Sequence, residues 1–189
     1  KAAAWHLDTN RIVAAGGSAG ACTSLWLAFH DEMADPTSDD PVARESTRLT
    51  AVAVSGAQTT LDPKQMKEWT PNSYYGAHAF GIPILATESD RRIGRFTRFL
   101  ESRELLVPWI QEYSPYALVT ADDPPVYMLY NNKPALGHDA KDPTHSANFG
   151  VKLKEQLDSV KVPCELVYPD APNVKHSNLS DAVIDFLIP

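Results

Sequence analysis

Short apolar runs alternate along this chain with longer segments in which apolar residues recur every three or four positions. Short runs bounded by turn residues are typical of buried strands, and they lie at 12–15, 49–56, 125–130 and 164–168. The longer segments predict helices at 19–33, 63–69, 87–106, 107–113, 148–160 and 179–187. Because strands alternate with helices, the pattern predicts an α/β fold with a mostly parallel sheet flanked by helices.

One region departs from this alternation. Residues 57–120 follow the second predicted strand and contain helical patterns together with an irregular stretch at 70–86 that is rich in Gly, Pro and aromatic residues. The sequence predicts that this excursion is a cap or lid on the main body. Residues 1–189 are therefore expected to belong to one domain.

Composition narrows the range of functions. The chain has 189 residues and a formal net charge of -7, and it has no basic cluster, which disfavours a nucleic-acid partner. No run approaches the roughly 18 apolar residues of a membrane span. Cys22 and Cys164 have no partners at metal-ligand spacing and are expected to be small buried side chains. No cofactor is predicted.

The segment Gly16-Gly17-Ser18-Ala19-Gly20 has the form G-x-S-x-G and lies between a predicted strand and a predicted helix. This context is typical of a nucleophile elbow, in which a sharp turn holds a serine clear of the sheet. Small flanking residues are needed because the backbone folds back on itself. The sequence therefore predicts Ser18 as a nucleophile and the N–H of Ala19 as an oxyanion donor.

A serine nucleophile needs a base and an acid that orients the base. After an elbow, the triad follows the chain order Ser, then Asp or Glu, then His. His176 is the only histidine beyond the last predicted strand, so it is the predicted base. His138 and His145 flank the loop in which the acid is expected.

The acid is expected in the loop after the strand 125–130. Asp142 is the preferred candidate because it precedes the next helix, and Asp139 is the alternative. A carboxylate in this loop could instead cap that helix. The same loop contains His138 and His145, but four possible metal ligands crowded into one loop, with no second cluster, disfavour a metal site.

These residues resemble the α/β-hydrolase superfamily on its carboxylesterase and lipase-like side. The stretch 8–20 is similar to the D-x-x-R-I-x-x-x-G-x-S-A-G segment of esterases related to hormone-sensitive lipase, and the resemblance extends to Asp142-Pro143 and the strand leading to His176. It implies a serine carboxylic ester hydrolase without a cofactor. Ser18 would be its nucleophile, Asp142 its acid and His176 its base.

Two features differ from this family. Its members place about four strands and a His-Gly-Gly oxyanion loop before the elbow, whereas Ser18 lies near the start of this chain. The chain is therefore expected to be the C-terminal part of a hydrolase that an N-terminal segment or chain completes, which leaves its cellular location open. In addition, Lys175-His176-Ser177 stands where the family has Gly-His-Gly.

Aromatic residues of the excursion are candidates for a substrate pocket, although they could equally pack the cap onto the body. They are Trp69, Tyr74, Tyr75 and Phe80. The resemblance is compatible with acetyl or feruloyl esters of carbohydrates and with small soluble esters. The alternatives are a serine peptidase of the same fold and a non-catalytic binding protein, and the latter would usually have lost its nucleophile or base.

Overall fold

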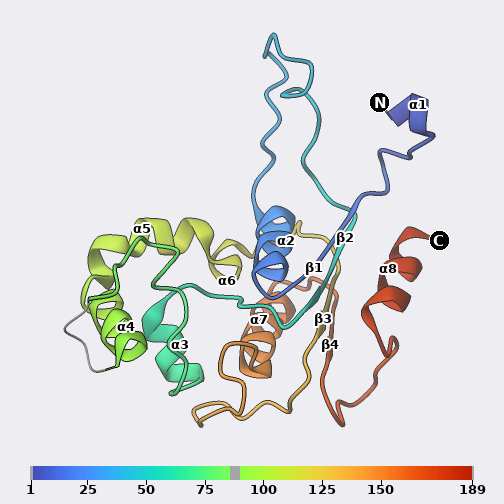
Figure 1. The fold of residues 1–189 in the computed structure, drawn as a ribbon. Helices are drawn as coiled ribbons and strands as arrows, with labels where there is room; N and C mark the ends of the chain where they lie inside the picture. Colours follow the sequence, from blue (N-terminus) through green and yellow to red (C-terminus); the bar gives the residue numbers. More distant parts are fainter. Residues whose placement is uncertain (1, 86–89, 189) are drawn as a thin grey trace.

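The structure is a computed structural model that describes residues 2–85 and 90–188. Its centre is a sheet of four parallel strands in the order β1-β2-β3-β4 (Figure 1). The strands are β1 (Val13–Gly17), β2 (Ala51–Ser55), β3 (Val126–Leu129) and β4 (Cys164–Val167). The predicted parallel sheet is thus confirmed, and all four strands end at the same edge.

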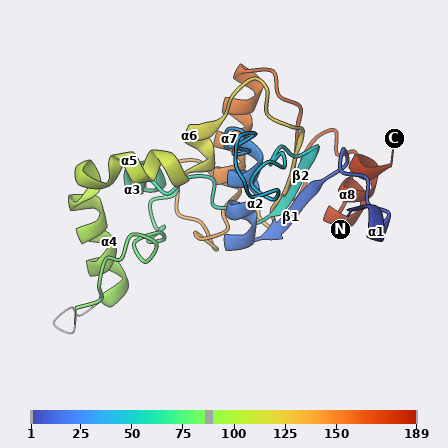
Figure 2. The ribbon, with the colours of Figure 1, turned by 90° about the horizontal axis from the view of Figure 1, so that it is seen from above.

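Helices cover both faces of the sheet, as Figure 2 shows. Alternate residues of a strand point to opposite faces. Val52 and Val54 of β2 are therefore buried in the larger core, which α2 (Ala19–Phe29) and α7 (Ala147–Ser159) complete. Ala53, between them, belongs to a second cluster under α8 (Leu179–Leu187).

The helices of the excursion extend away from this body (Figure 1). They are α3 (Pro63–Trp69), α4 (Arg91–Glu101), α5 (Arg103–Tyr113) and α6 (Pro115–Leu118). The prediction of a single helix over 87–106 was wrong, because the helix breaks at Ser102 and not after Leu106. Residues 87–89 of that prediction lie outside the described residues. The short α6 begins at Pro115, since proline is well tolerated in a first helical turn.

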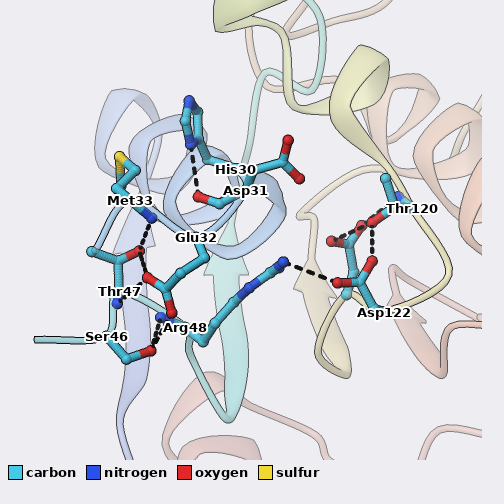
Figure 3. A network of polar contacts seen from close by, with 10 residues as sticks. His30, Asp31, Glu32, Met33, Ser46, Thr47, Arg48, Thr120 and Asp122 are labelled. Carbon is cyan, nitrogen blue, oxygen red and sulfur yellow. Dashed lines mark hydrogen bonds and ion pairs between the residues drawn. The ribbon is translucent and has the colours of Figure 1, made fainter. Parts of the chain in front are cut away.

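An arm formed by residues 31–48 extends from the end of α2 to the start of β2 (Figure 1). Glu32 joins the two ends of the arm. Its carboxylate accepts hydrogen bonds from the N–H and Oγ1 of Thr47, both at 2.8 Å, and from Ser46 Oγ (Figure 3). These bonds, that from Ser46 foremost, lower the pKa of Glu32 to about 2. Arg48 then ties the arm to Asp122, at 2.9 Å.

In Figure 1 the N-terminal helix α1 (Ala2–Trp5) lies apart from the sheet, joined to β1 by an extended segment. Among the described helices, none combines the length and the apolar character that crossing a membrane requires. Both cysteines are free and partly buried, and burial raises the pKa of the Cys22 thiol to about 11 and that of Cys164 to about 12.

Candidate active site

The turn between β1 and α2 holds Ser18 at the edge where the strands end. Ser18 has φ 52 and ψ -120, a conformation that few non-glycine residues adopt. Its N–H donates to the carbonyl of Ser55 at the end of β2, at 3.0 Å. A Cβ on Gly16 would lie 2.5 Å from the backbone of Gly20, so the turn requires glycine there. The predicted elbow is therefore present as a strand, a strained turn and a helix.

Two side chains of the loop between β3 and α7 extend a hydrogen-bonded chain from Ser18. His145 Nε2 lies 2.9 Å from Ser18 Oγ, and His145 Nδ1 lies 2.8 Å from Asp142 Oδ2. Partial burial tends to raise the pKa of Asp142, but hydrogen bonds from the side chain and backbone of His145 outweigh it and hold that pKa below its usual value. The three groups form a continuous hydrogen-bonded chain from carboxylate to imidazole to hydroxyl.

The imidazole of His145 lies against the end of β2. Gly56, with φ 59, follows that strand, and a Cβ on it would approach His145 Cδ2 to 3.3 Å. Gln58 holds the residue before His145: its side chain is fully buried and donates to the carbonyl of Thr144 at 2.8 Å. A glycine that leaves room and an amide that holds the preceding residue thus fix the position of His145.

Two asparagines hold the rest of this loop. Asn72 exchanges a pair of hydrogen bonds with the backbone of Ala140, at 2.9 and 3.0 Å. Asn148 does the same with Ala135, at 3.0 and 2.7 Å, and it also donates to the carbonyl of Trp69 at 2.7 Å. The loop that carries Asp142 and His145 is therefore attached to the excursion and to α7 by specific polar contacts.

His176, the base predicted from the sequence, does not reach Ser18. Its Nδ1 lies 2.6 Å from Glu165 Oε2 on β4, and its Nε2 lies 3.4 Å from Asp185 Oδ2 on α8. The loop after β4 folds back along its own strand, because Glu165 Oε1 accepts the N–H groups of Lys175 and His176 at 2.7 and 2.8 Å. The structure therefore corrects the position expected for this histidine, and His145 occupies that place instead.

The other candidates in the acid loop are placed differently. Asp139 and His138 are exposed, whereas Asp142 is the carboxylate that contacts the imidazole. The cap of α7 is Ser146, which accepts from the N–H of Asn148, so Asp142 is not needed for that role. Within residues 2–85 and 90–188, no three His, Cys, Asp or Glu side chains are grouped so as to hold a metal ion.

Ala19 lines a cavity of about 510 Å³, and so do two of the four predicted aromatic residues, Tyr75 and Phe80. Trp69 is only 4% exposed and packs against Tyr116 and Phe149, so it belongs to the core. Tyr74 packs edge-on against Phe96 and lines a separate, smaller cavity.

Comparison with solved structures finds the same fold in several hydrolases. An acetyl ester-xyloside bifunctional hydrolase from Caldicellulosiruptor lactoaceticus is 19% identical, with a TM-score of 0.57 over 86% of this chain and 47% of its own. A truncated carbohydrate esterase from gut microbiota is 16% identical, with a TM-score of 0.58 over 98% and 61% of the two chains. The esterase Est2 of Thermogutta terrifontis is 17% identical, with a TM-score of 0.52 over 96% and 56%.

No protein-family model matches the chain, and comparison with curated proteins finds no match. At these identities the structural likeness establishes the fold. The chain spans about half to three fifths of the length of the three solved structures described above. The chain therefore has an α/β-hydrolase fold of the kind found in esterases.

Proposed function

We propose that the protein is a serine hydrolase of carboxylic esters, with Ser18 as nucleophile, His145 as base and Asp142 as the acid that orients the base. The observation that carries this proposal is the hydrogen-bonded chain Asp142–His145–Ser18, with distances of 2.8 and 2.9 Å. A serine hydroxyl becomes a useful nucleophile near neutral pH when such a base removes its proton. The names of the structural neighbours, which are esterases and hydrolases, point to the same chemistry.

In the proposed reaction, Ser18 Oγ attacks the ester carbonyl carbon while its proton passes to His145 Nε2. The negative charge moves to the carbonyl oxygen, which the N–H of Ala19 can meet because the first N–H groups of a helix have no partner within it. Collapse of this intermediate breaks the bond to the alcohol, which leaves with the proton from His145. Water, activated by the same imidazole, then releases the acid and restores Ser18.

The test compares two histidine variants for hydrolysis of p-nitrophenyl acetate. His145→Ala should lower kcat by about 10³-fold or more, as should Ser18→Ala, because each removes a member of the triad. His176→Ala is the matched control and should keep kcat near the wild-type value at a temperature where the variant stays folded. The reverse result for the two histidines would move the base to His176 and refute the assignment.

The acid is tested in the same way with a pair of carboxylates. Asp142→Asn leaves the shape of the loop unchanged but favours the wrong imidazole tautomer, which should cost about 10³- to 10⁴-fold in kcat. Asp139→Asn, three residues away and exposed, should have little effect. Equal losses in both variants would contradict the role proposed for Asp142.

We further propose that a segment preceding this chain completes the site. Within the described residues, β1 pairs only with β2, so its other edge is free to pair, and a bare edge strand promotes aggregation. The chain spans about half of its solved neighbours, which is consistent with such a segment. It would also supply further oxyanion donors, and full activity from residues 1–189 alone would refute this part of the proposal.

The substrates that we propose are acetyl or feruloyl esters of carbohydrates, together with small soluble esters. One structural neighbour is named an acetyl ester-xyloside bifunctional hydrolase and another a carbohydrate esterase, which supports the first group. Release of acetate or ferulate from acylated xylan, compared with release from simple aryl esters, separates the two groups. A preference of less than about tenfold in kcat/KM would argue against a dedicated carbohydrate site.

A further inference from the structure

The cavity beside the elbow is built on one face of α2. Ala19, Cys22, Thr23 and Trp26 line it, and residues spaced by three and four positions lie on the same side of a helix. From Ala19 to Trp26 the helix rises about 10 Å. The cavity therefore runs from the proposed oxyanion donor along the helix for about two turns.

The walls of the cavity are mostly aromatic. Tyr75, His78 and Phe80 contribute from the loop before α4, and Trp109 and Tyr113 contribute from α5. The rings of Trp26 and Tyr113 stack at 6.3 Å, and those of Tyr75 and His78 meet edge-on at 5.0 Å. These contacts give the cavity a wall that suits apolar or flat groups.

Two polar side chains that line the cavity, Cys22 and Tyr75, carry no charge near neutral pH. Burial raises the pKa of the Cys22 thiol to about 11, so this group is neutral over the physiological range. Burial, with a contribution from nearby Cys22, likewise raises the pKa of the Tyr75 hydroxyl. Neither side chain would therefore present a charge to a ligand.

We propose that this cavity binds the acyl part of the ester, and that it selects apolar acyl groups much larger than acetyl, with Cys22 and Trp26 setting the limit. Of the esters proposed above, this selection favours feruloyl over acetyl esters. This inference rests on the proposed function, because it takes the carbonyl oxygen to lie at the N–H of Ala19. From that point the acyl chain can enter the cavity, since Ala19 is one of its lining residues.

The size of the cavity supports a large acyl group. The methyl of an acetyl group is comparable to one water molecule, about 30 Å³, and would leave most of the 510 Å³ without contacts. Each additional methylene transferred from water into such a site is expected to raise kcat/KM about fourfold until the cavity is filled. The chain length at which the gain stops then shows how long an acyl chain the cavity holds.

The experiment is a series of p-nitrophenyl esters from acetate to decanoate, measured with the wild-type protein and with Cys22→Phe. For the wild type, hexanoate should exceed acetate by about 200-fold in kcat/KM, since it has four more methylenes. Cys22→Phe places a large side chain in the cavity and should lower the ratio of kcat/KM for hexanoate to that for acetate at least tenfold. Leu27→Phe is the matched control, because Leu27 lies on the same helix, is 37% exposed and does not line the cavity.

A second variant extends the cavity. Trp26→Ala should move the optimum to a longer acyl chain, because the indole is the lining group of α2 farthest along the helix from Ala19. A wild-type profile that is flat or falls from acetate to hexanoate would overturn the inference and leave the proposed function intact. The same holds if chain length matters only in the alcohol part, tested with acetate esters of longer alcohols.

A binding measurement separates failure of the pocket from failure of the catalytic proposal. Calorimetry with Ser18→Ala and p-nitrophenyl hexanoate needs no turnover, and binding should weaken at least tenfold when Cys22→Phe is added. If the wild type cleaves no ester but this binding difference persists, the cavity assignment stands and the hydrolase proposal fails. If the two proteins bind equally, the cavity assignment fails.

Discussion

Asn148 is the buried side chain whose replacement tests most directly how the loop of Asp142 and His145 is held. It is fully buried, and its amide nitrogen donates to the carbonyls of Trp69 and Ala135 and to the hydroxyl of Thr70, at 2.7, 3.0 and 3.0 Å. Its amide oxygen accepts from the N–H of Ala135 at 2.7 Å. Asn148→Ala removes all four contacts at once.

The expected cost follows from counting these bonds. An amide group has two hydrogens for its three acceptors, so the four contacts amount to about three full hydrogen bonds, each with a net value of about 1 kcal/mol. The carbonyls of Trp69 and Ala135 also accept from Gly137 and His138, so they are not left bare. We therefore expect a loss of about 3 kcal/mol in the free energy of unfolding, or about 6–12 °C in Tm.

The assay is urea unfolding followed by circular dichroism, with the slope of the transition required to stay constant. Asn148→Asp provides the sharper comparison, because it keeps the volume and the acceptor but replaces the donating amide with a carboxylate oxygen facing two carbonyls. Asn148→Asp should therefore be less stable than Asn148→Ala at pH 7. The exposed Asn131→Ala should change stability by less than about 0.5 kcal/mol. An Asn148→Asp variant more stable than Asn148→Ala would show that volume, and not donation, is what matters there.

The remaining predictions concern packing and pH. Gly150→Ala should destabilise the protein by about 1–3 kcal/mol, because the new Cβ would lie 2.4 Å from Tyr130 Cε2, although alanine has the better helix propensity. Thermal melts measure this loss. Gly20→Ala is the control, since its Cβ would meet open space, and it should be neutral or stabilising. The folded pKa of Glu32, about 2, lies below its ordinary value of 4.5, so its contribution to closing the arm is complete above about pH 4.5 and is lost as the pH falls toward 2. Hydrogen-exchange protection of the Thr47 amide should fall over that range and become independent of pH in Glu32→Gln, and an unchanged profile in the variant would contradict the role of the carboxylate.

Most of the sheet could be predicted from the sequence because its signals are local. The runs at 49–56 and 125–130 contain β2 and β3, since β-branched and apolar residues in short bounded runs favour buried strands. The glycines around Ser18 marked the sharp turn after β1. The break at Ser102 was not predicted, because charged residues continue the helical pattern on both sides of it and only tertiary contacts decide where the chain bends.

Chain order alone could not show that His145, and not His176, lies beside Ser18. The rule of chain order, nucleophile then acid then base, is satisfied by His145 as well as by His176, and choosing the histidine after the last strand assumed that acid and base occupy different loops. The signal that could have revealed His145 is the turn Asp142-Pro143-Thr144-His145, in which Asp142 Oδ1 accepts the N–H of His145 at 3.3 Å. This turn brings the carboxylate of Asp142 and the imidazole of His145 together.

The strand order of the sheet, which follows the order of the chain, has a consequence for synthesis on the ribosome. Ser18 and the imidazole of His145 are 127 residues apart in the sequence. At a synthesis rate of about 5–20 residues per second, Ser18, the proposed nucleophile, is made roughly 6–25 s before His145, the proposed base. During that interval β1 and α2 can form against β2, but the serine has no partner to take its proton. On the proposed function, Ser18 therefore gains its base only when β3 and the turn after it have been added.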